Sequence, residues 1–156
     1  MTASSLKEHS PEIAARQNAM GILAKASAQD IADAWKNLRI EPSYSVIRPA
    51  EIGLVMVRGR AGGTGAPFNL CEATVTRCVV ALEDGTTGFG QALGRDKQKV
   101  LHTALIDALW QLPAHRATVE AKVLAPLAES QETSENETRA EVAATKVDFF
   151  TMVRGE

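Results

Sequence analysis

The chain has 156 residues, 45% of them hydrophobic and 23% charged, and its formal net charge is −2. This length and composition predict one soluble globular domain spanning residues 1–156, and the balanced charge excludes a global positive potential that would hold nucleic acid or an anionic membrane. No apolar run approaches the length of a secretory signal or a bilayer-spanning helix, so we expect a cytoplasmic protein without membrane contact.

Two helices followed by a group of strands are predicted from the N-terminus onward. The first helix is expected over residues 11–25, with Pro11 in its first turn, and the second begins after Ser27, a typical N-cap residue. Strands are predicted at residues 44–48, 52–60, 70–82 and 86–93, with a hairpin turn at 83–85. These connections are too short for crossover helices, so we expect an α+β fold with a mainly antiparallel sheet covered by helices.

The two cysteines, Cys71 and Cys78, are seven residues apart in one predicted strand. An odd separation places their side chains on opposite faces of a sheet, so they are not expected to form a disulfide with each other. The three histidines have no metal-ligand spacing with them, and no nucleophile–base pair is recognisable. The sequence therefore predicts neither a metal site nor a catalytic residue in this chain.

The segment after Gly94 has the clearest helical periodicity. Apolar residues recur at helical spacing from Val100 to Leu109, and Ile106 and Trp110 extend the apolar surface around the helix. We therefore expect burial on more than one face, either in the core of the chain or beneath a partner. On the second interpretation Ile106 and Trp110 are candidate interface residues.

The C-terminal part combines a polar stretch with an apolar end. Residues 128–138 are rich in Glu, Ser and Thr, a composition that predicts a flexible segment. Residues 139–156 form a helical and then apolar tail, although chain ends are usually polar. This tail is expected either to complete the sheet of the chain itself or to dock on a partner. Its candidate interface residues are Phe149, Phe150, Met152 and Arg154.

Arginine and glycine are concentrated between residues 58 and 65. Guanidinium groups bind phosphate or carboxylate through paired hydrogen bonds, and glycine leaves backbone N–H groups accessible. The candidate anion-binding residues of this loop are Arg58, Arg60, Gly62, Gly63, Thr64 and Gly65. The alternative interpretation is a hairpin turn that needs glycine, with the arginines on a solvated face.

Three further basic residues are candidate anion-binding groups. Arg77 lies on the next strand and would approach the same loop if the two strands paired across it. Arg95 and Lys97 flank Asp96 at a strand-to-helix junction, where a helix N-terminus can hold an anion. Asp96 can equally cap that helix, and the arginines can equally form a surface ion-pair network.

Five blocks of the sequence form a recognisable series. They are Arg58-x-Arg60-x-Gly62-Gly63-Thr64-Gly65-x-x-Phe68, Ala73-Thr74-x-Thr76-Arg77, Gly94-Arg95-Asp96-Lys97, Leu105-Ile106-Asp107-Ala108-Leu109 and Val147-Asp148-Phe149-Phe150-Thr151-Met152-Val153-Arg154-Gly155. Together these blocks resemble the PhnG family, the G subunits of the bacterial carbon–phosphorus lyase core complex. The resemblance covers roughly residues 14–156 and keeps the order of the blocks.

The resemblance implies a role that the residues alone do not indicate. It implies assembly with the H, I and J subunits, two copies of each, and transient action with the L protein. The G, H, I and L proteins would form α-D-ribose 1-methylphosphonate 5-triphosphate and adenine from MgATP and methylphosphonate, with the glycosyl chemistry in the I subunit. MgATP would be a substrate of the assembled transferase, and this chain alone would bind no cofactor and be inactive. The family member would either contribute anion-binding groups to the substrate site or act purely as a scaffold.

Overall fold

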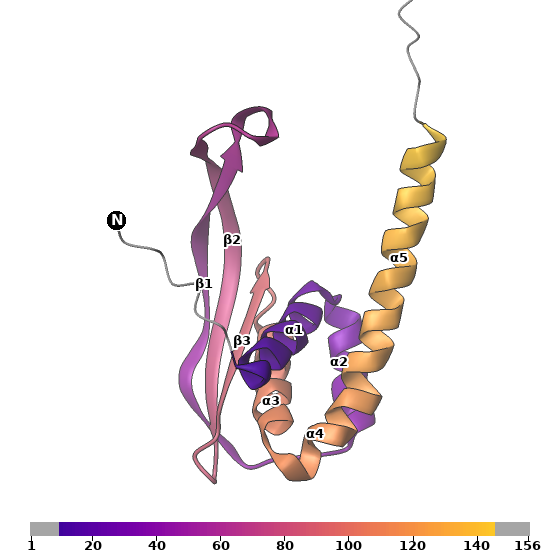
Figure 1. Ribbon diagram of the computed structural model, residues 1–156. Helices are drawn as coiled ribbons and strands as arrows, with labels where there is room; N and C mark the ends of the chain where they lie inside the picture. The colour runs from indigo at the N-terminus through magenta and orange to yellow at the C-terminus, as the bar shows by residue number, and fades with distance from the viewer. Residues whose placement is uncertain (1–9, 146–156) are drawn as a thin grey trace, which may run out of the picture.

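The computed structural model describes residues 10–145, which form an α+β fold, as expected (Figure 1). Two helices precede a three-stranded sheet, and three helices follow it. The elements are α1 (Pro11–Lys25), α2 (Ala28–Leu38), β1 (Tyr44–Arg60), β2 (Pro67–Leu82), β3 (Thr87–Leu93), α3 (Lys97–Gln111), α4 (Pro113–Val119) and α5 (Ala125–Ala144). A short 3-10 turn, η1 (Ala61–Gly63), joins β1 to β2, and a π-helical turn, η2 (Glu120–Leu124), joins α4 to α5.

A side chain caps the N-terminus of each of the helices α1, α2 and α3. Ser10 accepts a hydrogen bond from the backbone N–H of Ile13 at the start of α1. Ser27 and Asp96 cap α2 and α3, because each accepts a hydrogen bond from the N–H three residues further on, at 3.0 and 2.8 Å. The predicted caps at Ser27 and Asp96 are therefore confirmed.

The sheet is antiparallel throughout, with the strand order β1-β2-β3. The prediction of two separate strands before residue 60 is wrong, because β1 continues through Pro49. The pairing shifts there: Arg48 lies opposite Val79, and Glu51 lies opposite Arg77. Val46 lies opposite Val80, so β1 has two more residues than β2 between Val46 and Glu51. Such a bulged segment tolerates a proline that a regular central strand would not.

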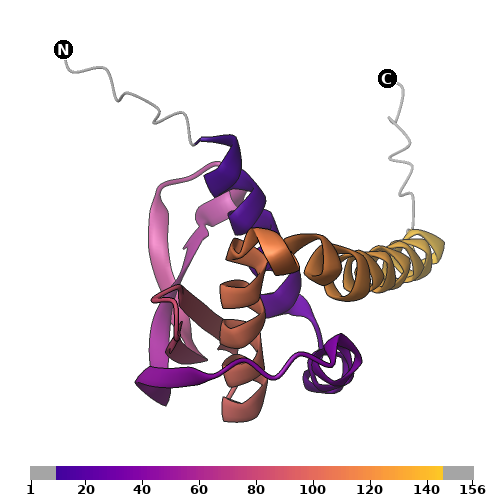
Figure 2. The same ribbon diagram turned by 90° about the horizontal axis from the view of Figure 1, so that it is seen from below.

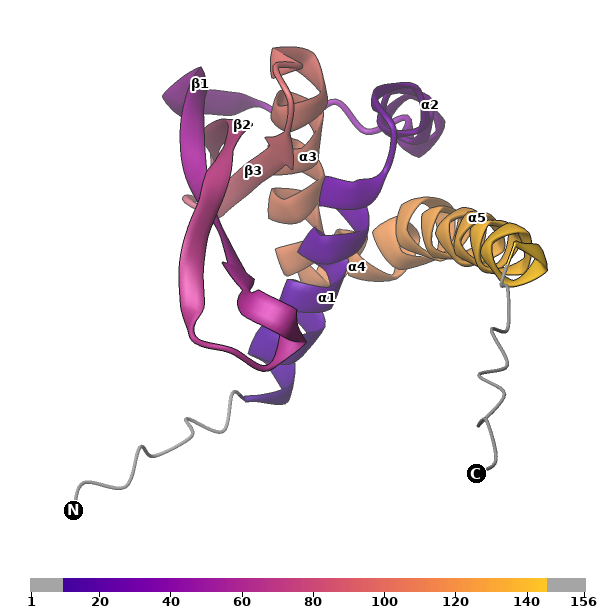
Figure 3. The same cartoon turned by 90° about the horizontal axis from the view of Figure 1, so that it is seen from above.

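Helix α3 lies at the centre of the molecule, between the sheet and α5 (Figure 2, Figure 3). Residues 103–110 of this helix are all buried. Gly88 and Gly90 on β3 allow this close packing, because a Cβ atom on either would overlap a backbone carbonyl oxygen of α3, that of Ala104 or Val100. Glycine at these two positions is thus required by helix–sheet packing.

The interpretation of Ile106 and Trp110 as interface residues is wrong for this conformation. Ile106 is fully buried and Trp110 is 3% exposed, both within the core of the chain itself. The indole N–H of Trp110 donates to Glu120, and the guanidinium of Arg116 lies 4.0 Å from its ring. The second apolar face of α3 is therefore covered by α4 and the helices around it.

A buried ion pair connects α1, α3 and β3. The carboxylate of Asp107 accepts hydrogen bonds from Nε and Nη2 of Arg16 at 3.0 and 2.7 Å, and from the backbone N–H of Phe89 at 2.9 Å. The Asp107 side chain is 1% exposed, whereas that of Arg16 is 29% exposed. The hydrogen bond to Asp107 raises the pKa of Arg16 further above its already high ordinary value.

The β1–β2 hairpin extends well beyond β3 as a two-stranded ribbon (Figure 1). β3 pairs only with residues 75–81 of β2, so the remaining part of the hairpin has no third strand. Large apolar side chains on this ribbon are at least 45% exposed. They are Ile52, Leu54, Met56, Phe68 and Leu70.

The polar residues 128–138 are part of helix α5, which corrects the prediction that they form a flexible segment. This helix is held to α1 by a hydrogen bond from Gln131 Nε2 to the carbonyl oxygen of Ile22, 2.8 Å long. The predicted interface residues Phe149, Phe150, Met152 and Arg154 lie outside the described residues. Among the described residues, no helix is both long and apolar enough to cross a bilayer.

Candidate functional site

The arginine–glycine loop forms the tip of the ribbon. Gly62 and Gly63 adopt positive φ angles of 60° and 80°, and the N–H of Gly65 donates to the carbonyl oxygen of Ala61. Arg60 closes the loop by donating from Nη1 to the carbonyl oxygen of Gly65 at 3.2 Å. The interpretation of this loop as a glycine-dependent turn is therefore confirmed. Binding of an anion by its residues, Thr64 included, stays a prediction.

Arg58 and Arg60 are both exposed at this tip, on the same side of β1. Together with Gly59 and Pro67 they line an open hollow of about 410 Å³. Arg58 forms no ion pair within residues 10–145, so its guanidinium remains available to a ligand or partner. The tip can thus contact an anion, but its open hollow would not enclose one.

The register of the hairpin separates Arg77 from this tip. Arg60 lies opposite Pro67, whereas Arg77 lies opposite Glu51. Arg77 is ten residue steps along the extended strand from Pro67, a distance of roughly 33 Å at 3.3 Å per residue. The expectation that Arg77 approaches the glycine loop is therefore wrong, and the three guanidinium groups do not form one site.

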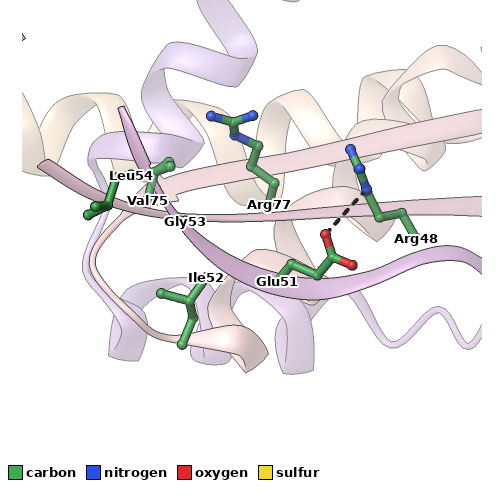
Figure 4. A pocket seen from close by; sticks show the side chains of 7 residues that line it. All are labelled: Arg48, Glu51, Ile52, Gly53, Leu54, Val75 and Arg77. Carbon is green, nitrogen blue, oxygen red and sulfur yellow. Dashed lines mark ion pairs between the residues drawn. The ribbon is translucent and has the colours of Figure 1, made fainter. Parts of the chain in front are cut away.

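Arg77 instead lines a small pocket at the bulge of β1. The pocket has a volume of about 170 Å³, and Arg48 and Arg77 extend toward the same side of the strands (Figure 4). Nε of Arg48 lies 3.4 Å from Oε2 of Glu51, and both side chains are about 60% exposed. Within the described part of the chain, Arg77 makes no ion pair. The buried Val75 and the exposed Gly53 lie beside these charged groups.

The charges of this pocket favour an anionic ligand. Two guanidinium groups face one carboxylate, so one positive charge remains, and the exposed Arg48–Glu51 pair contributes little to stability and can rearrange. The bulge brings Arg48 to this position, because it shifts β1 by two residues in all against β2 between Val46 and Glu51. The pocket lining contains no Ser, Cys, His or Lys that could act as a nucleophile.

Sequence reasoning missed Arg48 as a site residue. The available signal was Pro49, which interrupts a β-rich run and favours a bulge or an edge strand. The structure brings Arg48 together with one predicted residue, Arg77, and leaves Arg58 and Arg60 at the far end of the ribbon.

Arg95 and Lys97 are exposed at the start of α3. The carboxylate of Asp96 occupies this helix terminus by accepting the N–H of Lys99, so the capping interpretation is confirmed. Neither Arg95 nor Lys97 lines the pocket of Arg48 and Arg77. Their role in anion binding stays a prediction.

Comparisons with known proteins agree with the resemblance seen in the sequence blocks. A family model described as "Phosphonate metabolism protein PhnG" matches residues 14–155. The chain is also 46% identical, over 144 residues, to the "Alpha-D-ribose 1-methylphosphonate 5-triphosphate synthase subunit PhnG" of Rhizobium meliloti (strain 1021). The aligned region covers 92% of each of the two chains. The chain therefore belongs to the PhnG family of phosphonate metabolism proteins.

Proposed function

We propose that this chain is an obligate subunit of a transferase that forms α-D-ribose 1-methylphosphonate 5-triphosphate and adenine from MgATP and methylphosphonate. The observation that carries this proposal is the 46% identity to the Rhizobium meliloti synthase subunit over 92% of both chains. The chain would act with the H, I and L proteins and reside in a core complex containing two copies each of G, H, I and J. The glycosyl transfer itself would take place on the I subunit.

Within this assembly, we propose that the pocket of Arg48 and Arg77 contacts a phosphate or phosphonate group. Both substrates carry such groups, and a guanidinium can offer each of them two parallel N–H donors. The excess positive charge of the pocket supports this role, and the lack of a nucleophile in its lining is consistent with an accessory subunit. Arg58 and Arg60 at the tip are a second place for the same contact.

A purely structural role is the second candidate, and the ribbon supports it. Leu54 and Leu70 are about 60% exposed on the part of the hairpin that extends beyond its pairing with β3. Soluble proteins seldom leave so many large apolar side chains exposed together, and such surfaces mark interfaces. On this view the ribbon would position neighbouring subunits and no residue of the chain would touch a substrate.

The variant Arg77→Gln distinguishes the two roles. It is co-expressed with the H, I and J subunits, and the purified complex is supplied with the L protein, MgATP and methylphosphonate. Size-exclusion mass and adenine release are measured on the same samples. Arg39→Gln is the matched control, because Arg39 is exposed and lies at the end of α2, away from the pocket lining.

We expect Arg77→Gln to leave the mass of the complex unchanged and to lower adenine release at least tenfold. This decrease corresponds to the loss of one charge-assisted hydrogen bond of about 1.5–3 kcal/mol. Activity that falls only in proportion to lost assembly would support the scaffold role. Unchanged mass and activity would refute substrate contact at Arg77.

The apolar tail is a separate part of the proposal. We propose that residues 147–154 contact a partner subunit, since their apolar composition is unusual for a chain end. A chain that ends after Lys146 should then be lost from the co-expressed complex. Retention of the shortened chain at full mass would refute this contact.

A further inference from the structure

The second half of α5 is an exposed helical arm. Leu127 is the last buried residue of this helix, and every residue from Glu132 to Ala144 is exposed. Helices shorter than about 12–15 residues are marginal in water, and most helical stability in proteins comes from packing. Four residues of the arm are Ser, Thr or Asn, which favour helix less than alanine does. The arm, residues 132–144, is therefore a helix that a packing surface would stabilise.

The ribbon of β1 and β2 lacks support in the same way. Its last pairing with β3 is that of Val75 with Leu93, so only two strands continue toward the tip. A two-stranded hairpin is marginally stable unless a third strand or a helix packs against it. Leu54 and Met56 alternate along β1 and are 60% and 51% exposed, so they share one apolar face. A helix lying on this face would cover it.

The arm and the ribbon carry opposite charges. β1 and β2 contain four arginines and two glutamates, a net charge of +2. α5 contains five glutamates and one arginine, a net charge of −4. Both elements extend in the same direction beyond α3 (Figure 1). A second copy of the chain can therefore present its arm to the ribbon of the first copy, with opposite charges facing each other.

We propose that two copies of this chain associate with two-fold symmetry, the arm of each copy packing on the ribbon of the other. Such a contact is closed, because it uses the same two surfaces twice. Val142, 64% exposed, would cover Leu54 and Met56, and the neighbouring Glu141 would lie beside Arg58. The lengths agree: the arm is roughly 18 Å long, and residues 54–60 of β1 extend roughly 20 Å.

The surface available sets the strength of this dimer. A helix roughly 18 Å long and 11 Å wide has a side surface of about 600 Å². If each arm and the ribbon beneath it bury about 250 Å² apiece, the two contacts bury roughly 1,000 Å² in total, the lower limit for a specific interface. We therefore expect a weak dimer, with a micromolar Kd, that depends on its charges and is sensitive to salt.

This inference does not depend on the transferase function proposed above. The dimer is the form of the free chain, and docking of other subunits on the ribbon would separate the two copies. The test uses the isolated full-length chain, whereas the transferase proposal is tested in the co-expressed complex. Failure of one proposal is therefore distinguishable from failure of the other.

Sedimentation equilibrium of the full-length chain tests the inference. The mass is measured from about 1 to 300 μM chain, at about 0.05 and 0.5 M NaCl. We expect the mass to rise with concentration toward twice the 16.7 kDa of one chain and not beyond it. The higher salt concentration should raise the Kd at least about tenfold, because it screens the attraction between arm and ribbon.

Charge reversal tests which surfaces meet. Arg58→Glu and Glu141→Arg should each raise the Kd at least about tenfold, because the reversed charge faces a like charge in both contacts. An equal mixture of the two variants should dimerise again, since the acidic ribbon of one meets the basic arm of the other and the second contact is unchanged. Lys122→Glu and Glu83→Arg are the matched controls, because both residues are exposed and lie outside the arm and the ribbon.

Hydrogen exchange of the unmodified chain provides a measurement that needs no substitution. Amides of residues 132–144 should exchange more slowly in concentrated than in dilute solution, because the dimer stabilises the arm. Exchange of the arm that is independent of concentration would overturn the inference.

Three sedimentation results would also overturn it. The first is a monomer at every concentration, which would leave the arm and the ribbon to a different protein. The second is growth beyond the dimer, because a closed contact stops at two copies. The third is a mixture of Arg58→Glu and Glu141→Arg that dimerises no better than either variant alone. Circular dichroism of each variant verifies that the fold is retained.

Discussion

Replacement of Asp107 by alanine removes the carboxylate that joins α1, α3 and β3. The substitution eliminates two hydrogen bonds from Arg16, at 3.0 and 2.7 Å, and leaves the N–H of Phe89 without its acceptor. Breaking a buried ion pair costs about 3–5 kcal/mol. Because the Arg16 side chain is 29% exposed and can be hydrated in part, the lower limit of that range applies. The unpaired N–H adds about 1 kcal/mol.

We therefore expect Asp107→Ala to lower the free energy of unfolding by about 4 kcal/mol, a large share of the 5–15 kcal/mol typical of a domain. At about 2–4 °C per kcal/mol, Tm should fall by roughly 8–16 °C. Urea denaturation followed by circular dichroism measures the change. Asp33→Ala is the control, since the carboxylate of Asp33 is 53% exposed, and it should change stability by less than about 0.5 kcal/mol.

A double-mutant cycle with Arg16→Met isolates the interaction between the two side chains. If Asp107→Ala cost less than about 1 kcal/mol, or if the cycle gave no coupling, the ion pair would not hold these three elements together. Stability would then come from apolar packing alone.

Three further predictions concern packing, thiol chemistry and pH. Gly88→Ala should lower the free energy of unfolding by about 3 kcal/mol in urea denaturation, because its Cβ would overlap the backbone of α3. Gly53→Ala is the control, because a Cβ at Gly53 meets no atom within 4 Å. A maleimide should label the exposed Cys71 in the native protein and Cys78 only after unfolding, because Cys78 is 1% exposed and burial raises the pKa of its thiol; peptide mass mapping identifies the site. Burial lowers the pKa of His102 below 6.5, so the unfolded chain binds more protons below that pH, and stability should fall between pH 7.5 and 5.5, less steeply in His102→Phe.

Each of these predictions has a result that contradicts it. Equal stability of the Gly88 and Gly53 variants would mean that α3 and β3 can separate at little cost. Labelling of Cys78 at the rate of Cys71 would indicate frequent opening of the core. Identical pH dependence of the His102→Phe variant and the unmodified chain would assign the proton uptake to other groups.

Local signals in the sequence predicted the helix starts and the hairpin. Ser27 and Asp96 cap helices because their side-chain oxygens satisfy N–H groups three residues away, a relation that spacing alone reveals. Gly85 has a φ of 86°, and because glycine favours such angles, its position in the sequence predicts this hairpin turn.

Strand register and helix packing, which depend on residues far apart in the sequence, could not be predicted from such local signals. The position of Arg77 depends on the register of a long hairpin, and the bulge around Arg48 changes that register by two residues. The burial of Ile106 and Trp110 follows from how α4 folds back over α3, which no local pattern encodes. The pocket of Arg48 and Arg77 was therefore only half predicted: Arg77 was named as a candidate anion-binding residue, and Arg48 was missed.

The polar residues of α5 form part of one continuous helix. Glu, Gln and Ser tolerate helix, and neither Gly nor Pro interrupts residues 127–144. The helix is anchored at Gln131 and continues to Ala144, roughly 20 Å further at 1.5 Å per residue. A flexible linker would allow its two ends a wide range of separations, whereas a helix sets one. Residues 131–144 therefore have one defined length, and each residue inserted into them would lengthen the helix by about 1.5 Å and rotate its end by about 100°.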